Sequence, residues 1–242
     1  MRTSNKILLG IFLVPLIILT LIHVTLYAKL KSGHYVAMKT VQEDRFMRYA
    51  PKNINSIAVY GLNNFNIMPS DSLKLEIEKV PNSHLHYAIR GDSLIILGDS
   101  GINRPGGSAD AERSYQVVNL YIPSAANILA DNSDVNLRGS KDSLKANSYH
   151  FSLSGSAGLK IDDDGNDSAH VYFKVLTIQA SHSDGIELTA RSHVADLQLT
   201  LVESAFTDNG ASIDKLLINA DKPSSITLKG DNLAKLNLIK KP

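Results

Sequence analysis

The sequence predicts an all-β exported domain, a β-solenoid with coils of about 20 residues, preceded by one N-terminal transmembrane helix. Two observations carry this prediction. The first is a charge-free apolar run near the N-terminus, and the second is a set of leucine and isoleucine pairs that recur at a nearly constant spacing. The alternative fold is an antiparallel β-sandwich, whose strands also recur at short intervals.

Residues 7–28 form the apolar run ILLGIFLVPLIILTLIHVTLYA, which contains no Asp, Glu, Lys or Arg. As a helix at about 1.5 Å per residue, these 22 residues would span roughly 33 Å, enough for the hydrocarbon core of a bilayer. The run is longer than the apolar part of a typical signal peptide. We therefore expect an uncleaved signal anchor, with cleavage to a secreted or surface-exposed protein as the alternative.

The charges that flank this run are nearly balanced, since Arg2 and Lys6 precede it and Lys29 and Lys31 follow it. Large following domains translocate largely regardless of such charges. We therefore expect a single-pass inner-membrane protein whose C-terminal domain lies in the periplasm. The predicted organisation is a short cytoplasmic tail at 1–6, a transmembrane helix at 7–28, a linker at 29–54 and a β domain at 55–242.

From residue 57 onward, short alternating runs are separated by Asn, Asp, Ser, Pro and Gly, which is the pattern of half-buried strands and turns. In the C-terminal half, inward leucines recur in steps of 21, 19 and 20 residues, and the apolar residues two positions later keep that spacing: Leu176, Leu197, Leu216 and Leu236, then Ile178, Leu199, Ile218 and Leu238. A constant period with two strands per period is typical of stacked coils that cover one another's apolar faces.

The composition argues against several classes of function. The net charge is only +1, and no basic patch with interleaved aromatic residues occurs, so we expect no nucleic acid as a partner. The chain contains no cysteine, which excludes disulfides, thiolate metal sites and a cysteine nucleophile.

His182, Ser183 and Asp184 stand side by side in ASHSDG, and they are the residue types of a hydrolase triad. We interpret them as a turn between strands, because Ser, Asp and Gly favour turns for backbone reasons. The members of a triad usually come from distant segments of the chain. The sequence therefore predicts no catalytic residues here.

An enzymatic alternative is a polysaccharide lyase or hydrolase. Asp164, Asp184 and Glu203 are spaced by 20 and 19 residues, and stacked coils would bring them to one face as acid–base groups. The next coil has Lys222 at that place, which interrupts the ladder. Polar turns at this spacing also arise from solubility alone, so we expect a protein that is not an enzyme.

The run IDDDGNDS at 161–168 places Asp162, Asp164 and Asn166 at alternate positions. Carboxylate and amide oxygens suit calcium, although the spacing does not match an EF-hand loop. These three residues are a weak calcium site, the one cofactor that the sequence suggests, and a solvated loop is the alternative. His84 and His86 share one strand face, but no third metal ligand is identifiable beside them.

The runs NINSIAVYGLNNFNIMPSDSLKLEIEK and HLHYAIRGDSLIILGD, followed by VNLYIPSAANI and repeated L-x-I and L-x-L pairs, resemble the head-GIN domain family. Members of this family are described as auto-transporter adhesins and are common in the Bacteroidetes. The resemblance covers about residue 54 to the C-terminus. It implies an exported β-helical envelope domain with an adhesive or scaffolding role, no enzyme activity and no site residues.

The sequence thus predicts a non-enzymatic binding, adhesion or scaffold module of the cell envelope. The expected partners are the membrane, through residues 7–28, and an envelope protein or glycan. A regulatory or assembly role with an inner-membrane partner is the alternative.

Overall fold

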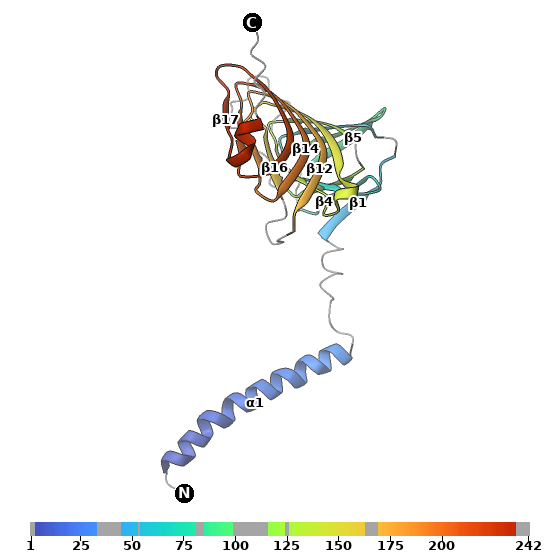
Figure 1. Cartoon of the computed structure of the whole chain (residues 1–242). Coiled ribbons are helices and arrows are strands. Elements are labelled where there is room, and N and C mark those ends of the chain that lie inside the picture. The colour runs from blue at the N-terminus through green and yellow to red at the C-terminus, as the bar shows by residue number, and fades with distance from the viewer. Residues whose placement is uncertain are drawn as a thin grey trace. The chain divides into compact units, whose positions relative to one another are not determined.

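The computed structural model describes residues 3–32, 45–52, 54–80, 85–98, 116–123, 126–162 and 169–235. The chain divides into two units, residues 1–45 and 46–242. The first contains helix α1 (Thr3–Lys31), and the second contains all the described strands (Figure 1). Strand β1 (Phe46–Tyr49) lies within the segment that the sequence assigned to a linker.

Helix α1 does not support the predicted transmembrane helix at 7–28. In the part of the chain that the structure describes, no helix has both the length and the apolar character needed to cross a membrane. Helix α1 contains the polar residues Thr20, His23 and Thr25, whose side chains form hydrogen bonds with backbone carbonyls one turn earlier. Lys29 and Lys31 follow in the last turn.

The second unit consists of two sheets, which we call sheet A and sheet B. In spatial order, the nine strands of sheet A are β1, β4 (Lys74–Glu78), β7 (Val118–Ile122), β3 (Phe65–Pro69), β9 (Asp134–Arg138), β11 (Gly158–Asp162), β13 (Gly185–Leu188), β15 (Ala205–Asp208) and β17 (Ser225–Thr227). The eight strands of sheet B are β16 (Ser212–Ala220), β14 (Ser192–Val202), β12 (Val171–Ser181), β10 (Asn147–Ser154), β8 (Ala126–Asp131), β2 (Ser56–Tyr60), β6 (Ser93–Leu97) and β5 (His86–Arg90). Two short 3-10 helices are described as well, η1 (Ser143–Lys145) and η2 (Gly230–Lys235).

The strands of the C-terminal half pair in parallel. Leu176 pairs with Leu197, and Leu197 pairs with Leu216, so the leucine spacing in the sequence corresponds to neighbours across sheet B. Leu236 and Leu238, the expected next pair, lie outside the described residues.

The N-terminal half is arranged differently. Strand β4 is antiparallel to both β1 and β7, and β5 is antiparallel to β6. Strands β5 and β6 are too close in sequence for a coil, and a two-residue turn at Gly91 and Asp92 joins them, with φ +63° at Gly91.

Both sheets are therefore mixed. The prediction of an all-β domain is confirmed, but the β-solenoid is wrong, because the coils do not run through the whole domain. Two large facing sheets fit the alternative of a sandwich better, although most of their strand pairs are parallel.

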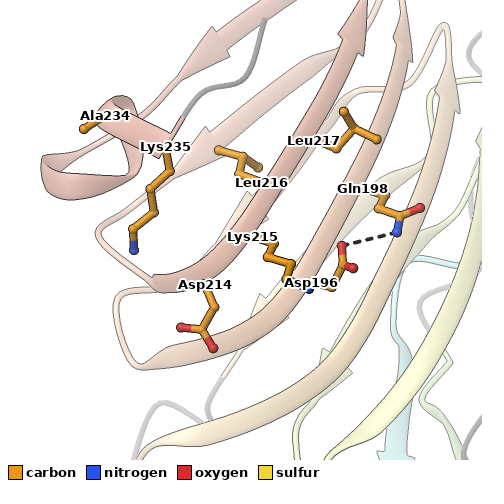
Figure 2. Close-up of a pocket in the computed structure, with 8 residues that line it drawn as sticks. All are labelled: Asp196, Gln198, Asp214, Lys215, Leu216, Leu217, Ala234 and Lys235. Atoms are coloured by element: carbon orange, nitrogen blue, oxygen red, sulfur yellow. Dashed lines mark hydrogen bonds between the residues drawn. The ribbon is translucent and has the colours of Figure 1, made fainter. Parts of the chain in front are cut away.

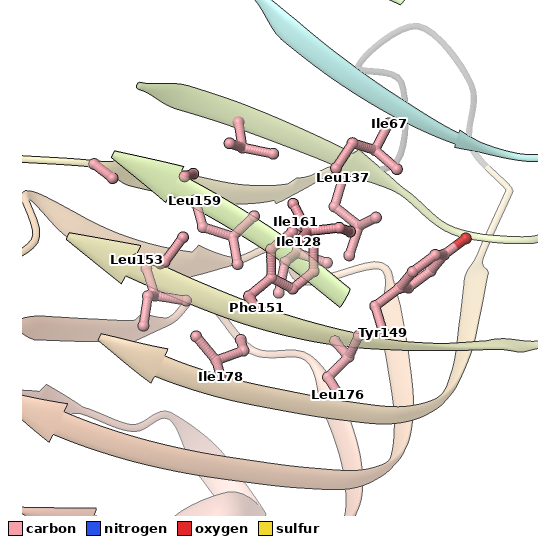
Figure 3. Close-up of a cluster of buried hydrophobic side chains, with 14 of the residues drawn as sticks. Ile67, Ile128, Leu137, Tyr149, Phe151, Leu153, Leu159, Ile161, Leu176 and Ile178 are labelled. Atoms are coloured by element: carbon pink, nitrogen blue, oxygen red, sulfur yellow. The ribbon is translucent and has the colours of Figure 1, made fainter. Parts of the chain in front are cut away.

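One hydrophobic core lies between the two sheets (Figure 3). Alternation along the strands turns every second side chain inward, as in β9, where Val135 and Leu137 are buried. Tyr149 and Phe151 of β10 are the bulkiest members near the middle, with ring centres 6.3 Å apart. Full burial of a side chain of this size contributes about 1.5–3 kcal/mol to stability.

Helix η2 covers part of the outer edge of β16. The Nδ2 of Asn232 donates a hydrogen bond to the carbonyl of Ala211 at 2.8 Å, and the Nζ of Lys235 donates to the carbonyl of Ile213 at 2.7 Å. These side-chain donors occupy carbonyls on the edge of sheet B where a further strand would bind.

Asp208, at the end of β15, is fully buried and holds η2 in place. One carboxylate oxygen accepts hydrogen bonds from the backbone N–H groups of Gly210 and Ala211, both at 2.8 Å. The other accepts from the backbone N–H of Lys229 at 3.2 Å and from Nδ2 of Asn232 at 2.8 Å. Four donors therefore surround this buried carboxylate.

Candidate binding surface

His182, Ser183 and Asp184 form the corner between β12 and β13. The Ser183 side chain is buried, and its hydroxyl has no hydrogen-bond partner in the described part of the chain. The His182 ring lies on the exposed side of the corner, with Nε2 3.2 Å from Oε2 of Glu203. Its backbone has φ +53°, a conformation of tight turns. The three side chains do not converge, so their arrangement is that of a corner and not of a triad.

The predicted acidic ladder does not form among its described members. Strands β13 and β15 pair Ile186 with Phe206, and the same register continued backwards places Asp184 beside Ser204. Glu203 contacts the His182 ring instead. Asp164, the third predicted member, lies outside the described residues.

The structure describes few of the residues that the sequence suggests as metal ligands. Asp164, Asn166 and His84 lie outside the described residues, and Asp162 is described only as the last backbone position of β11. His86 begins β5. Within the described ranges, no three His, Asp or Glu side chains are grouped so as to hold a metal ion. The weak calcium site stays a prediction.

A groove of about 530 Å³ lies at the C-terminal edge of sheet B (Figure 2), lined by Asp196, Gln198, Asp214, Lys215, Leu216, Leu217, Ala234 and Lys235. Four of its polar side chains, those of Asp196, Gln198, Asp214 and Lys235, are paired with one another or with neighbours. Asp196 accepts a hydrogen bond from Gln198 at 3.2 Å, and Asp214 lies 3.2 Å from the ring of His193. The Nζ of Lys235 is bound to a backbone carbonyl.

A different polar surface lies on the outer face of sheet A and centres on Glu76 of β4. Leu75 and Ile77 point into the core, so Glu76 points outward, yet it is only 6% exposed. Its Oε1 accepts hydrogen bonds from Nε of Arg48 at 3.0 Å and from Nζ of Lys74 at 2.6 Å. Its Oε2 accepts from the hydroxyl of Tyr121 at 3.2 Å.

These contacts fix the protonation states of the cluster. Burial raises the pKa of Glu76, but the hydrogen bonds from Lys74, Arg48 and Tyr121 outweigh it, and the net pKa lies below the ordinary value of 4.5. Burial and the charge of Glu76 raise the pKa of Tyr121. At neutral pH the carboxylate is therefore ionised and the phenol keeps its proton as a donor.

Three asparagines continue this row across the sheet. Glu76 pairs with Asn119 of β7, which pairs with Asn66 of β3, which pairs with Asn136 of β9. The Nδ2 of Asn66 donates to Oδ1 of Asn119 at 3.0 Å, and the Nδ2 of Asn136 donates to Oδ1 of Asn66 at 3.2 Å. With neighbouring strands about 4.8 Å apart, the row from Glu76 to Asn136 is roughly 14 Å long. We call Glu76, Asn119, Asn66 and Asn136 the polar row.

Sequence reasoning missed the polar row, although a signal for it is present. Each asparagine stands between two apolar residues within a strand, in Phe-Asn-Ile at 65–67 and twice in Val-Asn-Leu at 118–120 and 135–137. Asparagine is depleted in strands, so three such positions indicate an outward amide with a specific partner.

No family model and no curated protein matches the chain. Several solved structures are similar to it, among them three that are each described as a "putative adhesin". The one from Parabacteroides distasonis has a TM-score of 0.38 and 14% identity, and the match covers 75% of this chain and 76% of that one. Those from Bacteroides fragilis and Parabacteroides merdae have TM-scores of 0.34 and 0.27 and identities of 10% and 11%. They cover 75% and 76% of this chain, and 95% of each of their own chains. At TM-scores this low, the likeness carries no argument about what this chain does.

Proposed function

We propose that this chain is a non-enzymatic adhesion module of the cell envelope, and that it binds a glycan through the polar row on the outer face of sheet A. The observation that carries the proposal is the hydrogen-bonded chain of Asn136, Asn66 and Asn119, which lies in register with the buried carboxylate of Glu76. Groups held by their neighbours lose little conformational freedom when a ligand binds.

The chemistry of the row suits sugar hydroxyl groups. Each amide has two N–H donors and a carbonyl that accepts, and the hydrogen bonds along the row use one N–H of Asn66 and one of Asn136. The side chains are half-buried, so they remain open to the solvent side. A repeating ligand can meet amides that repeat at the strand spacing.

The resemblance of the sequence to the head-GIN family supports an adhesive role and a place in the envelope. The side chains of His182, Ser183 and Asp184 do not converge, and this supports the choice of binding over catalysis. Location in the envelope is part of the proposal, and fractionation of cells that produce the chain tests it.

The binding test uses the full chain and a panel of immobilised polysaccharides. Asn66→Ala removes the central amide, and we expect it to weaken retention by about tenfold, since it unpairs both neighbouring asparagines. Gln179→Ala is the matched control, because Gln179 is an exposed amide on the outer face of β12 in sheet B. Equal retention of the two variants, or no polysaccharide retained by the unaltered chain, would refute the proposal.

A further inference from the structure

Cationic side chains surround one end of the polar row. From their placement we infer that the ligand is an acidic polysaccharide whose carboxylates bind at Arg48 and Lys74. This inference rests on the proposed glycan-binding function and names the class of glycan.

Arg48 offers a fork for a carboxylate. It uses its Nε to bond Glu76 at 3.0 Å, and its side chain is 41% exposed. The bond to a buried carboxylate fixes the plane of the guanidinium, and the two terminal nitrogens remain for a ligand. Arginine binds carboxylates through such paired N–H groups.

Lys74 supplies a second cation next to this fork. Its Nζ lies 2.6 Å from Oε1 of Glu76 and 4.9 Å from the centre of the Tyr121 ring, and the side chain is 40% exposed. Lys74 therefore covers the ring, so we expect recognition by charge and hydrogen bonds and not by stacking of a sugar on Tyr121.

The local charge favours an anion. Arg48, Lys74 and Arg138, which also acts electrostatically on Tyr121, carry three positive charges against the two negative charges of Glu76 and Glu78. The next outward carboxylate of β4, Glu78, accepts a hydrogen bond from the backbone N–H of Val117 at 3.2 Å.

The neighbouring asparagines distinguish a polysaccharide from other anions. Beyond the cations the row continues with Asn119, Asn66 and Asn136, which are neutral and present amides. A polymer of uronic acids carries hydroxyl groups beside every carboxylate, so it can place a carboxylate at the cations and hydroxyl groups on the amides. A polyanionic peptide such as polyglutamate has no hydroxyl groups to offer the amides.

The experiment compares polygalacturonate with the same polymer after complete methyl esterification, both binding to the full chain. The ester keeps the sugar backbone and removes the charge. We expect the ester to bind at least about tenfold more weakly, and binding of polygalacturonate to weaken as salt screens the charges. Equal binding of both polymers would overturn the inference and leave the proposed function standing. Binding of neither, with no neutral polymer retained, would overturn both.

Variants locate the site. We expect Arg48→Gln to weaken polygalacturonate binding about tenfold, and Arg48→Lys, which keeps the charge but lacks the fork, to recover only part of it. Lys174→Gln removes an exposed cation on β12 of sheet B and is expected to change binding less than about twofold. Loss through Lys174→Gln, no loss through the Arg48 variants, or equal competition by polyglutamate would each overturn the inference. Circular dichroism of every variant shows whether it is folded.

Discussion

Replacing Asp208 with alanine is expected to lower the free energy of unfolding of the β domain by about 3–5 kcal/mol. The carboxylate is fully buried and accepts four hydrogen bonds, from the backbone of Gly210, Ala211 and Lys229 and from the side chain of Asn232. At about 1.5–3 kcal/mol for each bond to a charged group, the gross loss would be roughly 6–12 kcal/mol. Two effects offset part of this gross loss: water enters the gap, and the alanine variant no longer has to bury a charged carboxylate. The expected net loss is therefore about 3–5 kcal/mol.

The assay is unfolding of the full chain by urea and by heat, each monitored by the circular dichroism signal of the β strands. For a domain of this size, about 2–4 °C per kcal/mol corresponds to a fall in Tm of roughly 6–20 °C. Asp214→Ala is the control, because its side chain is 54% exposed and pairs with His193 on the surface, and we expect it to cost less than about 1 kcal/mol. If Asp208→Ala stays within about 1 kcal/mol of this control, the reasoning about the buried carboxylate is refuted.

Three further predictions concern stability. Ser133→Ala should cost about 1–3 kcal/mol, because its buried hydroxyl accepts from one backbone N–H and donates to one carbonyl, whereas Ser183→Ala should cost less than about 0.5 kcal/mol; equal losses in urea unfolding would contradict this. Because the pKa of Glu76 in the folded protein is below 4.5, its stabilising contribution is fully present above that pH and is lost as pH falls through the lower value. The difference in unfolding free energy between the wild type and Glu76→Gln should therefore shrink between pH 7 and pH 3, and a constant difference would speak against the network. Gly98→Ala should cost about 1–3 kcal/mol, since its Cβ would collide with the backbone carbonyl of Gly61, and an unchanged Tm would show that the backbone moves aside.

The sequence was informative where its apolar pattern is regular. The spacing of Leu176, Leu197 and Leu216 predicted neighbours that the structure pairs in register. The spacing indicates which residues lie side by side on neighbouring strands. It does not indicate where parallel pairing gives way to the antiparallel pairs of the N-terminal half. The direction of β4 is invisible in LKLEIEK, because an alternating strand buries the same side chains whether its neighbours run parallel or antiparallel.

The candidate surface was harder to predict for the same reason. Asn66 meets Asn119 and Asn136 because β3 lies between β7 and β9, two strands more than 50 residues away in sequence. Only the topology brings the three amides together. The corner at His182 shows the opposite case, since residues adjacent in sequence point apart once the backbone takes a positive φ.

The contacts of η2 bear on how the molecule behaves at high concentration. A row of free carbonyls at a sheet edge is a template on which another polypeptide can add, and unprotected edges lead to fibrils. Asn232 and Lys235 place their own donors on the carbonyls of Ala211, just before β16, and of Ile213 within it, so these two carbonyls already accept a hydrogen bond within the chain. The same few residues that complete the fold thus also make the edge a poorer template, and crowded molecules can lie next to each other without adding strands at these two carbonyls.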